Sequence, residues 1–162
     1  MKSSIDLGGI RLGFEIKNYN PAYKNDKDRG YYDYWCDVSV SLDSTKGSWL
    51  SYRIENQPIL LCGEVDKIIE WIQKALSGEF KGNDHKELEF IEPDLVFDFF
   101  YHGFCLSVFF WDDDGALTTN HLKLEFWKEL EPFLDYLLLA TGRISADDER
   151  IRKHIEKGLI IL

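Results

Sequence analysis

Histidine and cysteine are the side chains that most often bind metals or act as nucleophiles, and neither forms a recognisable site in this sequence. The histidines fall in predicted loop, hairpin, strand and helix segments: His85, His102, His121 and His154. No two of them have the H-x-x-x-H or H-x-x-E-H spacing of a metal site. The cysteines are isolated thiols without a C-x-x-C pair: Cys36, Cys62 and Cys105. We therefore expect no metal and no cofactor.

Phosphate-binding and nucleophile motifs are also missing from the sequence. It has no G-x-S-x-G elbow, no P-loop and no G-x-G-x-x-G motif. Gly8-Gly9 precedes a predicted strand rather than a helix, so these glycines are not placed to cradle a phosphate. An odd number of separated cysteines indicates a reducing compartment rather than a disulfide framework. We expect the chain not to be an enzyme.

Two clusters of carboxylates have both a chemical and a structural interpretation. Glu92-Pro93-Asp94 could supply a pair for acid–base work, but a proline between two carboxylates is more typical of a bend between edge segments. The run Asp112-Asp113-Asp114 could bind a cation or a basic partner. It could equally be a solvated hairpin turn, because aspartate favours turns through hydrogen bonds to its own backbone.

A polar stretch from Asn18 to Gly30 is rich in turn-forming residues and predicts a long surface loop with a functional role. Tyrosines, an aspartate and a tryptophan follow directly at residues 31–35, a composition that protein interfaces use. We therefore predict partner-binding residues in this loop and in the acidic run: Asp26, Asp28, Tyr31, Tyr32, Asp33, Asp112, Asp113 and Asp114.

The charge balance narrows the class of partner. The chain has 19 Lys and Arg against 29 Asp and Glu, for a net charge of −10. Nucleic acids and anionic membrane surfaces are disfavoured, because both attract cationic proteins. An acidic surface favours a basic protein partner, although the same excess of acid also keeps a protein soluble. Met1–Asp6 has no apolar run and no stretch is long enough to span a membrane, so we expect a cytoplasmic protein.

Apolar periodicity predicts the elements that must position these residues. With 162 residues, the chain is expected to form one domain, residues 1–162. Alternation predicts strands at residues 10–17 and 35–42, the second with Tyr34, Cys36, Val38, Val40 and Leu42 on one face. A turn at Gly47-Ser48-Trp49 and a further strand should follow before the next helix. The period then changes to that of a helix at Glu64–Ser77, whose apolar stripe should be buried: Val65, Ile68, Ile69, Ile72 and Leu76.

The second half of the chain predicts a meander followed by helices. Four further strands are expected at residues 87–91, 95–101, 104–111 and 117–127, joined by short turns. A helix at Leu130–Thr141 and another after the capping-box pattern at Ser145–Asp148 follow. The expected fold is α+β: a mostly antiparallel meander sheet of about six or seven strands, one helix packed across a face, and two C-terminal helices. The last segment, 145–162, ends in the apolar tail Leu159–Leu162, which should be covered within the chain or by a second subunit.

One ordered set of residues resembles a known family. Its elements are Trp35-x-x-Val38-x-Val40, Gly47-x-Trp49, Glu64-Val65-x-x-Ile68-Ile69-x-Trp71-Ile72, Gly78 and Phe90-x-Glu92-Pro93-x-Leu95-x-Phe97. The set is similar to the WapI family of bacterial immunity proteins and covers about residues 30–140. The resemblance implies a small cytoplasmic protein that binds and neutralises a cognate toxin domain of the Rhs/Wap type, without catalysis. It carries no functional residues to transfer.

Two classes of function remain open on the sequence alone. The first is a toxin-neutralising binding protein whose partner is a basic toxin domain. The second is an acidic protein-interaction or regulatory domain without a toxin partner. A small enzyme ranks behind both, because no cluster of polar residues converges in the sequence. The sequence leaves the oligomeric state open.

Overall fold

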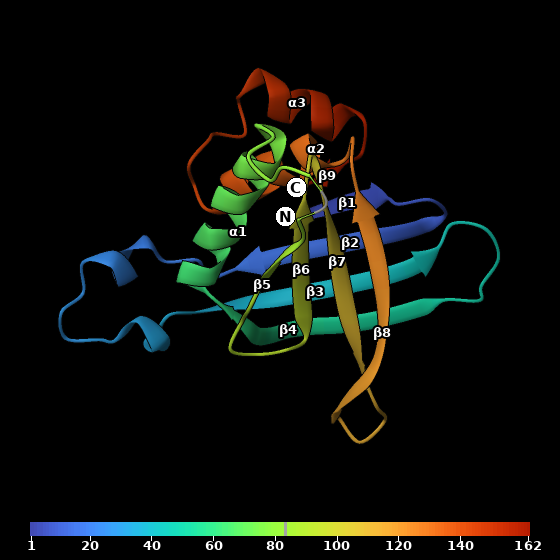
Figure 1. Ribbon diagram of the computed structural model, residues 1–162, viewed down its shortest axis with the longest axis horizontal. Coiled ribbons are helices and arrows are strands. Elements are labelled where there is room, and N and C mark those ends of the chain that lie inside the picture. Colours follow the sequence, from blue (N-terminus) through green and yellow to red (C-terminus); the bar gives the residue numbers. More distant parts are fainter. Residues whose placement is uncertain (83) are drawn as a thin grey trace.

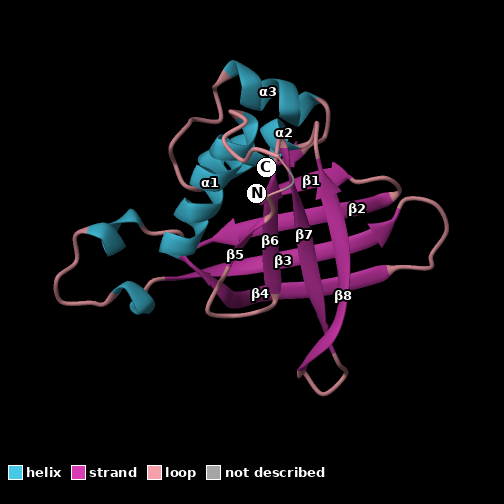
Figure 2. Cartoon of the chain, in the orientation of Figure 1, coloured by secondary structure: helices cyan, strands magenta, loops and turns pink. Residues whose placement is uncertain are grey.

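Two antiparallel sheets lie face to face in the computed structural model, and the strands of one run across those of the other (Figure 1). The structure describes residues 1–82 and 84–162. Within these residues the chain forms three α-helices and nine strands. Figure 2 shows the helices gathered at one end of the two sheets, close to both ends of the chain.

The first sheet contains the N-terminal strands and the last one. Its order is β4 (Ser51–Leu61), β3 (Trp35–Ser44), β2 (Ile10–Lys17), β1 (Lys2–Asp6) and β9 (Ile160–Ile161). Along β3 the side chains alternate between buried and half-buried, as the sequence predicts for residues 35–42. The buried set points toward the second sheet and forms one wall of the core.

The second sheet is a simple meander of the later strands. Its order is β5 (Lys86–Leu88), β6 (Leu95–Phe100), β7 (Gly103–Trp111) and β8 (Leu117–Phe126). Its inner face is aromatic, with the rings of Phe104 and Phe126 stacked at 4.3 Å between centroids. Two sheets that each have one apolar face bury those faces against one another, which accounts for the face-to-face arrangement.

Three helices close one end of the sheets: α1 (Cys62–Leu76), α2 (Leu130–Ala140) and α3 (Glu149–Glu156). The predicted stripe of α1 is confirmed, since Val65, Ile68, Ile69 and Ile72 are fully buried and Leu76 is half-buried. Glu64 closes a capping box by accepting the backbone N–H of Leu61 at 2.8 Å. None of the helices in residues 1–82 and 84–162 is long and apolar enough to cross a membrane.

The α+β class and the antiparallel pairing are confirmed, but the prediction of a single sheet of six or seven strands is wrong. Helix α1 begins directly after β4 and carries the chain to a second layer, where β5 to β8 pair only with each other. The strands β1 and β9 were not predicted. Both are short, and the β1 sequence KSSID is mostly polar, so neither shows clear alternation.

The start of the last helix also differs from the prediction. The capping-box pattern placed it at Ser145, whereas α3 begins at Glu149 with Asp148 as its cap. The carboxylate of Asp148 accepts the backbone N–H of Arg150 at 2.9 Å. The hydroxyl of Ser145 accepts the N–H of Asp147 at 3.2 Å and so stabilises a turn before the helix.

The apolar tail is covered in part, by a strand that was not expected. Ile160 is buried and pairs with Ser3, while Ile161 is 44% and Leu162 is 69% exposed. Deleting Leu159–Leu162 removes this buried side chain, worth about 1.5–3 kcal/mol. We expect the melting temperature to fall by about 5–10 °C, measured by circular dichroism. Deleting Leu162 alone is the control and should leave the melting temperature unchanged. A wild-type value for the longer deletion would show that β9 is dispensable.

Candidate functional site

The 18–34 loop joins β2 to β3 and projects beyond the end of the five-stranded sheet (Figure 1). It contains two short 3-10 turns, η1 (Pro21–Lys24) and η2 (Tyr31–Asp33). The side chain of Asn20 caps η1 by accepting the backbone N–H of Ala22 at 2.9 Å. The loop therefore has a defined conformation despite its polar sequence.

The carboxylate of Asp66, in the first turns of α1, anchors this loop to the rest of the protein. The hydroxyls of Tyr19 and Tyr23 donate to it at 2.7 and 2.5 Å, and the ammonium of Lys24 lies 2.7 Å away. Arg143, after α2, adds an ion pair. Burial by itself would raise the pKa of Asp66, but these partners outweigh it and hold the pKa below its usual value. Burial and the bond to Asp66 raise the pKa of Tyr19 to about 12.

Tyr31 fixes the far end of the loop by lying over Gly63 at the start of α1. A Cβ at position 63 would lie 2.1 Å from Cε2 of Tyr31, so the ring reaches this position only because residue 63 is glycine. The Tyr31 ring lies 5.9 Å from the ring of Tyr23 and 5.3 Å from that of Tyr32. Tyr32 is 66% exposed and forms the outer end of this aromatic cluster.

The loop residues predicted to bind a partner fall into two groups. Asp26 and Tyr31 have contacts inside the protein, since Asp26 accepts hydrogen bonds from the hydroxyl of Tyr34 and from backbone N–H groups. These bonds hold the pKa of Asp26 below its usual value. The other three are exposed: Asp28, Tyr32 and Asp33.

The predicted acidic run forms the turn between β7 and β8. Asp112 shapes it by accepting the N–H groups of Asp114 and Ala116 at 3.0 and 2.8 Å, while Asp113 and Asp114 are exposed. Figure 1 places this turn at the free tip of the β7–β8 hairpin, well away from the 18–34 loop. The structure therefore does not bring the two predicted partner-binding segments into one surface.

The carboxylates of Glu92-Pro93-Asp94 lie in the bend between β5 and β6, as the structural interpretation expects. Asp94 is 3% exposed and accepts the indole N–H of Trp111 at 2.5 Å. Its backbone carbonyl accepts the N–H of Phe109 at 2.9 Å. Asp94 therefore ties the bend to β7 rather than facing a substrate.

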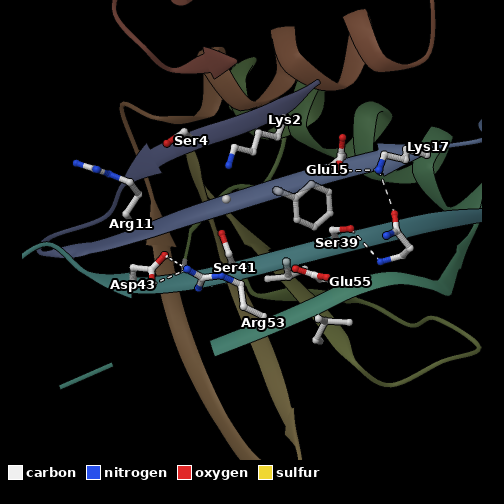
Figure 3. A pocket seen from close by; sticks show the side chains of 15 residues that line it. Lys2, Ser4, Arg11, Glu15, Lys17, Ser39, Ser41, Asp43, Arg53 and Glu55 are labelled. Atoms are coloured by element: carbon white, nitrogen blue, oxygen red, sulfur yellow. Dashed lines mark hydrogen bonds and ion pairs between the residues drawn. The ribbon is translucent and has the colours of Figure 1, made fainter. Parts of the chain in front are cut away.

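A hollow of about 390 Å³ lies on the outer face of the five-stranded sheet (Figure 3). Small side chains line its floor, namely Gly13, Ser39 and Ser41. Charged side chains surround the floor: Lys2, Arg11, Glu15, Lys17, Asp43, Arg53 and Glu55. They pair with one another, Arg53 with Asp43 at 2.8 Å and Lys17 with Glu15 at 3.2 Å. The hollow offers hydroxyl and charged groups for hydrogen bonding.

The outer face of the four-stranded sheet is aromatic instead. A hollow of about 490 Å³ there is lined by Phe100, Tyr101 and Trp127, together with Gly82, His85, Cys105, Lys123 and Glu125. Tyr101 is 50% and Trp127 is 52% exposed. Neither Phe100 nor Trp127 was singled out from the sequence. The available signal is alternation, because Phe100 shares the half-buried face of β6 with Asp98, and Trp127 directly follows β8 in phase with the exposed Glu125.

Two of the three cysteines are adjacent in space, which corrects the expectation of isolated thiols. The Sγ atoms of Cys36 on β3 and Cys62 at the start of α1 are 3.4 Å apart, and both residues are fully buried. They meet because the N–H of Cys62 donates to the carbonyl of Tyr34 at 2.8 Å. The hydrogen bond from Cys36 and the N–H of Asn20 lower the pKa of Cys62 to about 7 against the opposing effect of burial.

Two histidines pair with aspartates, and one of them, His85, lines the same hollow as Cys105. His85 pairs with Asp98 at 2.8 Å and His154 with Asp135 at 3.1 Å. Among residues 1–82 and 84–162, no group of three or more His, Cys, Asp and Glu side chains is placed to hold a metal ion.

The family model of the immunity protein WapI-like family matches residues 4–137. The chain belongs to the WapI-like immunity protein family. The match begins earlier than the resemblance seen from residue 30, and takes in β2 and the 18–34 loop. Helix α3 and strand β9 lie outside the WapI-like match. Neither the curated proteins nor the solved structures give a match to this chain.

Proposed function

We propose that this protein is a cytoplasmic immunity protein that binds a cognate polymorphic toxin domain and neutralises it without catalysis. The observation that carries the proposal is the WapI-like match over residues 4–137, which extends across strands β2 to β8 and helix α1. Neutralisation by binding requires a rigid surface rather than a reaction centre. Both hollows described above are lined by groups suited to contact, which supports this mode of action.

The charge of the chain supports a basic toxin domain as partner. With a net charge of −10, the protein attracts cationic surfaces over a distance of about 10 Å at moderate salt. Opposite charge on a partner speeds association with an acidic protein and gives a complementary potential across the interface.

The proposal predicts stoichiometric protection. The first step is to establish whether a large polymorphic toxin gene lies immediately upstream of the gene for this chain, and the toxin domain that it encodes is then the probe. Co-expression should restore growth to cells that make the toxin domain. Inhibition of the purified domain should be complete at about one immunity protein per toxin, with a dissociation constant in the nanomolar range. Titration of toxin activity with the immunity protein measures the stoichiometry, and isothermal titration calorimetry measures the stoichiometry and the dissociation constant.

Two outcomes contradict the proposal in different ways. Protection at a small fraction of one equivalent would indicate a catalytic antidote instead of a binding protein. No binding and no protection against the neighbouring toxin domain would favour an acidic interaction or regulatory domain without a toxin partner. An unrelated acidic protein of similar net charge is the control, and should neither bind nor protect.

A further inference from the structure

Strand register determines which side chains of the four-stranded sheet face away from the core. Glu87 pairs with Asp98, Asp98 with Cys105, and Cys105 with Glu125, so these four form one row across the sheet. Their neighbours along the strands, such as Phe97, are fully buried and point to the other side. We call the side that bears this row the outer β5–β8 face.

No helix packs on the outer β5–β8 face among the described residues. Helix α1 contacts the opposite side of the sheet, where Trp71 packs edge-on against the buried ring of Phe99 at 5.5 Å between centroids. Figure 1 shows the middle of β6, β7 and β8 with no helix in front of it. The side chains of this face are therefore accessible to a partner.

The centre of the outer β5–β8 face has the composition of a protein-binding hot spot. The rings of Phe100 and Trp127 lie 4.8 Å apart, and the ring of His85 lies 5.3 Å from Phe100. With Tyr101 they line the hollow of about 490 Å³. Tryptophan and tyrosine beside a pocket supply large contact areas at low cost in conformational entropy, and such residues dominate the energy of many interfaces.

The row of the outer β5–β8 face carries three acidic side chains, Glu87, Asp98 and Glu125. Glu125 and Lys123 border the hollow, and Asp98 pairs with Lys123 at 3.7 Å and with His85 at 2.8 Å. The acidic turn at residues 112–114 lies at the end of the same β7–β8 hairpin. The face therefore fits a partner that presents lysine or arginine around an apolar side chain.

Two other exposed surfaces, the 18–34 loop and the hollow on the five-stranded sheet, lack this combination. The charges of the 18–34 loop are balanced, since Lys24, Lys27 and Arg29 stand against Asp26, Asp28 and Asp33. The hollow on the five-stranded sheet is lined by at least as many cationic side chains as carboxylates. The aromatic side chain in its lining is that of Phe14, which is fully buried. A basic partner is attracted less strongly to either surface.

We propose that the outer β5–β8 face is the docking surface for the basic face of the cognate toxin domain, an inference that rests on the proposed function. An apolar side chain of the toxin fills the hollow beside Trp127, and its lysines and arginines meet the row that includes Asp98 and Glu125. The 18–34 loop lies outside the centre of this interface.

The test uses the neighbouring toxin domain, carrying an inactivating substitution, and the full chain in surface plasmon resonance. Trp127→Ala should raise the dissociation constant about 30-fold or more, because it removes a central aromatic anchor. Glu125→Lys should slow association about tenfold at low salt and much less at high salt, because screening weakens the steering charge. Matched controls are Trp49→Ala, an exposed tryptophan of the β3–β4 turn, and Glu55→Lys on the other sheet. Both should bind within about twofold of wild type.

The outcomes distinguish a failure of the proposed docking surface from a failure of the proposed immunity function. Melting temperatures first establish that the variants are folded, which is expected because Trp127 is half exposed. If wild type binds and folded Trp127→Ala and Glu125→Lys bind equally well, the face is not the docking surface, while the immunity function stands. If wild type itself neither binds nor protects, the proposed function fails. A wild-type dimer that Trp127→Ala converts to a monomer would assign the face to a second copy of the chain instead.

Discussion

Replacing Phe104 by alanine is expected to lower the free energy of unfolding by about 3–5 kcal/mol. The ring of Phe104 is fully buried between the four-stranded sheet and helix α2. Its centroid lies 4.3 Å from Phe126, 5.3 Å from Phe99, 5.4 Å from Phe97 and 5.9 Å from Phe133. No smaller side chain can keep these contacts, and a close-packed interior relaxes only in part around the cavity.

Chemical denaturation followed by circular dichroism measures this loss. Phe109→Ala is the matched control, since Phe109 is a phenylalanine of the same strand that points to the opposite face and is half-buried. It should cost about 1 kcal/mol. Equal losses for the two variants would show that the aromatic layer between the sheets is not the centre of the core.

The second large effect is expected at the anchor of the 18–34 loop. Asp66→Ala should destabilise the protein by about 2–3 kcal/mol, because two tyrosine hydroxyls and two cations lose a shared carboxylate. The loss of stability should affect the 18–34 loop before it affects the rest of the protein. Amide hydrogen exchange in residues 19–34 should accelerate strongly, while exchange in the centre of β3 changes only with global stability.

Two comparisons make this result specific to the anchor. Glu70→Ala, on the same helix, breaks an exposed pair with Lys74 and should cost only about 0.3–0.5 kcal/mol. The pKa of Asp66 lies below its ordinary value in the folded state, so its stabilising effect is present above about pH 4 and is lost as the pH falls through the lowered value. The stability difference between wild type and Asp66→Ala should therefore shrink toward pH 2. A constant difference over this range would show that the charge of Asp66 does not anchor the loop.

Periodicity was sufficient to predict the elements that are long and one-sided. Helix α1 appears where the Val65–Leu76 stripe places it, and β3 buries the predicted face. Elements whose stability comes from pairing rather than from their own pattern could not be predicted. Strand β9 has two residues and exists because β1 provides an edge, so no local signal marks it. The division into two sheets likewise arises because the chain passes from one layer to the other at α1. Alternation within a single strand does not indicate to which sheet that strand belongs.

The candidate surfaces were predicted less completely than the fold. Tyr32, Asp28 and the tip at 113–114 are exposed, but composition could not show that Asp26 is hydrogen-bonded to Tyr34 or that the Tyr31 ring packs on Gly63. The pairing of Cys36 with Cys62 joins residues 26 positions apart and follows from a helix that starts where a strand ends. Such proximity depends on the tertiary fold, and sequence spacing does not contain it.

The burial of the thiols provides built-in chemical probes of the two candidate surfaces. Cys62 lies beneath the 18–34 loop, whose Asn20 N–H contacts its sulfur at 3.4 Å, and Cys105 lies in the floor of the hollow beside Trp127. An alkylating reagent reaches the fully buried Cys62 only when the structure around it opens, whereas it approaches Cys105 through the hollow, so the two labelling rates report on separate parts of the protein. A bound toxin domain on the outer β5–β8 face would slow alkylation of Cys105 and leave that of Cys62 unchanged. Mass spectrometry of the wild-type chain can thus footprint the partner without a single substitution.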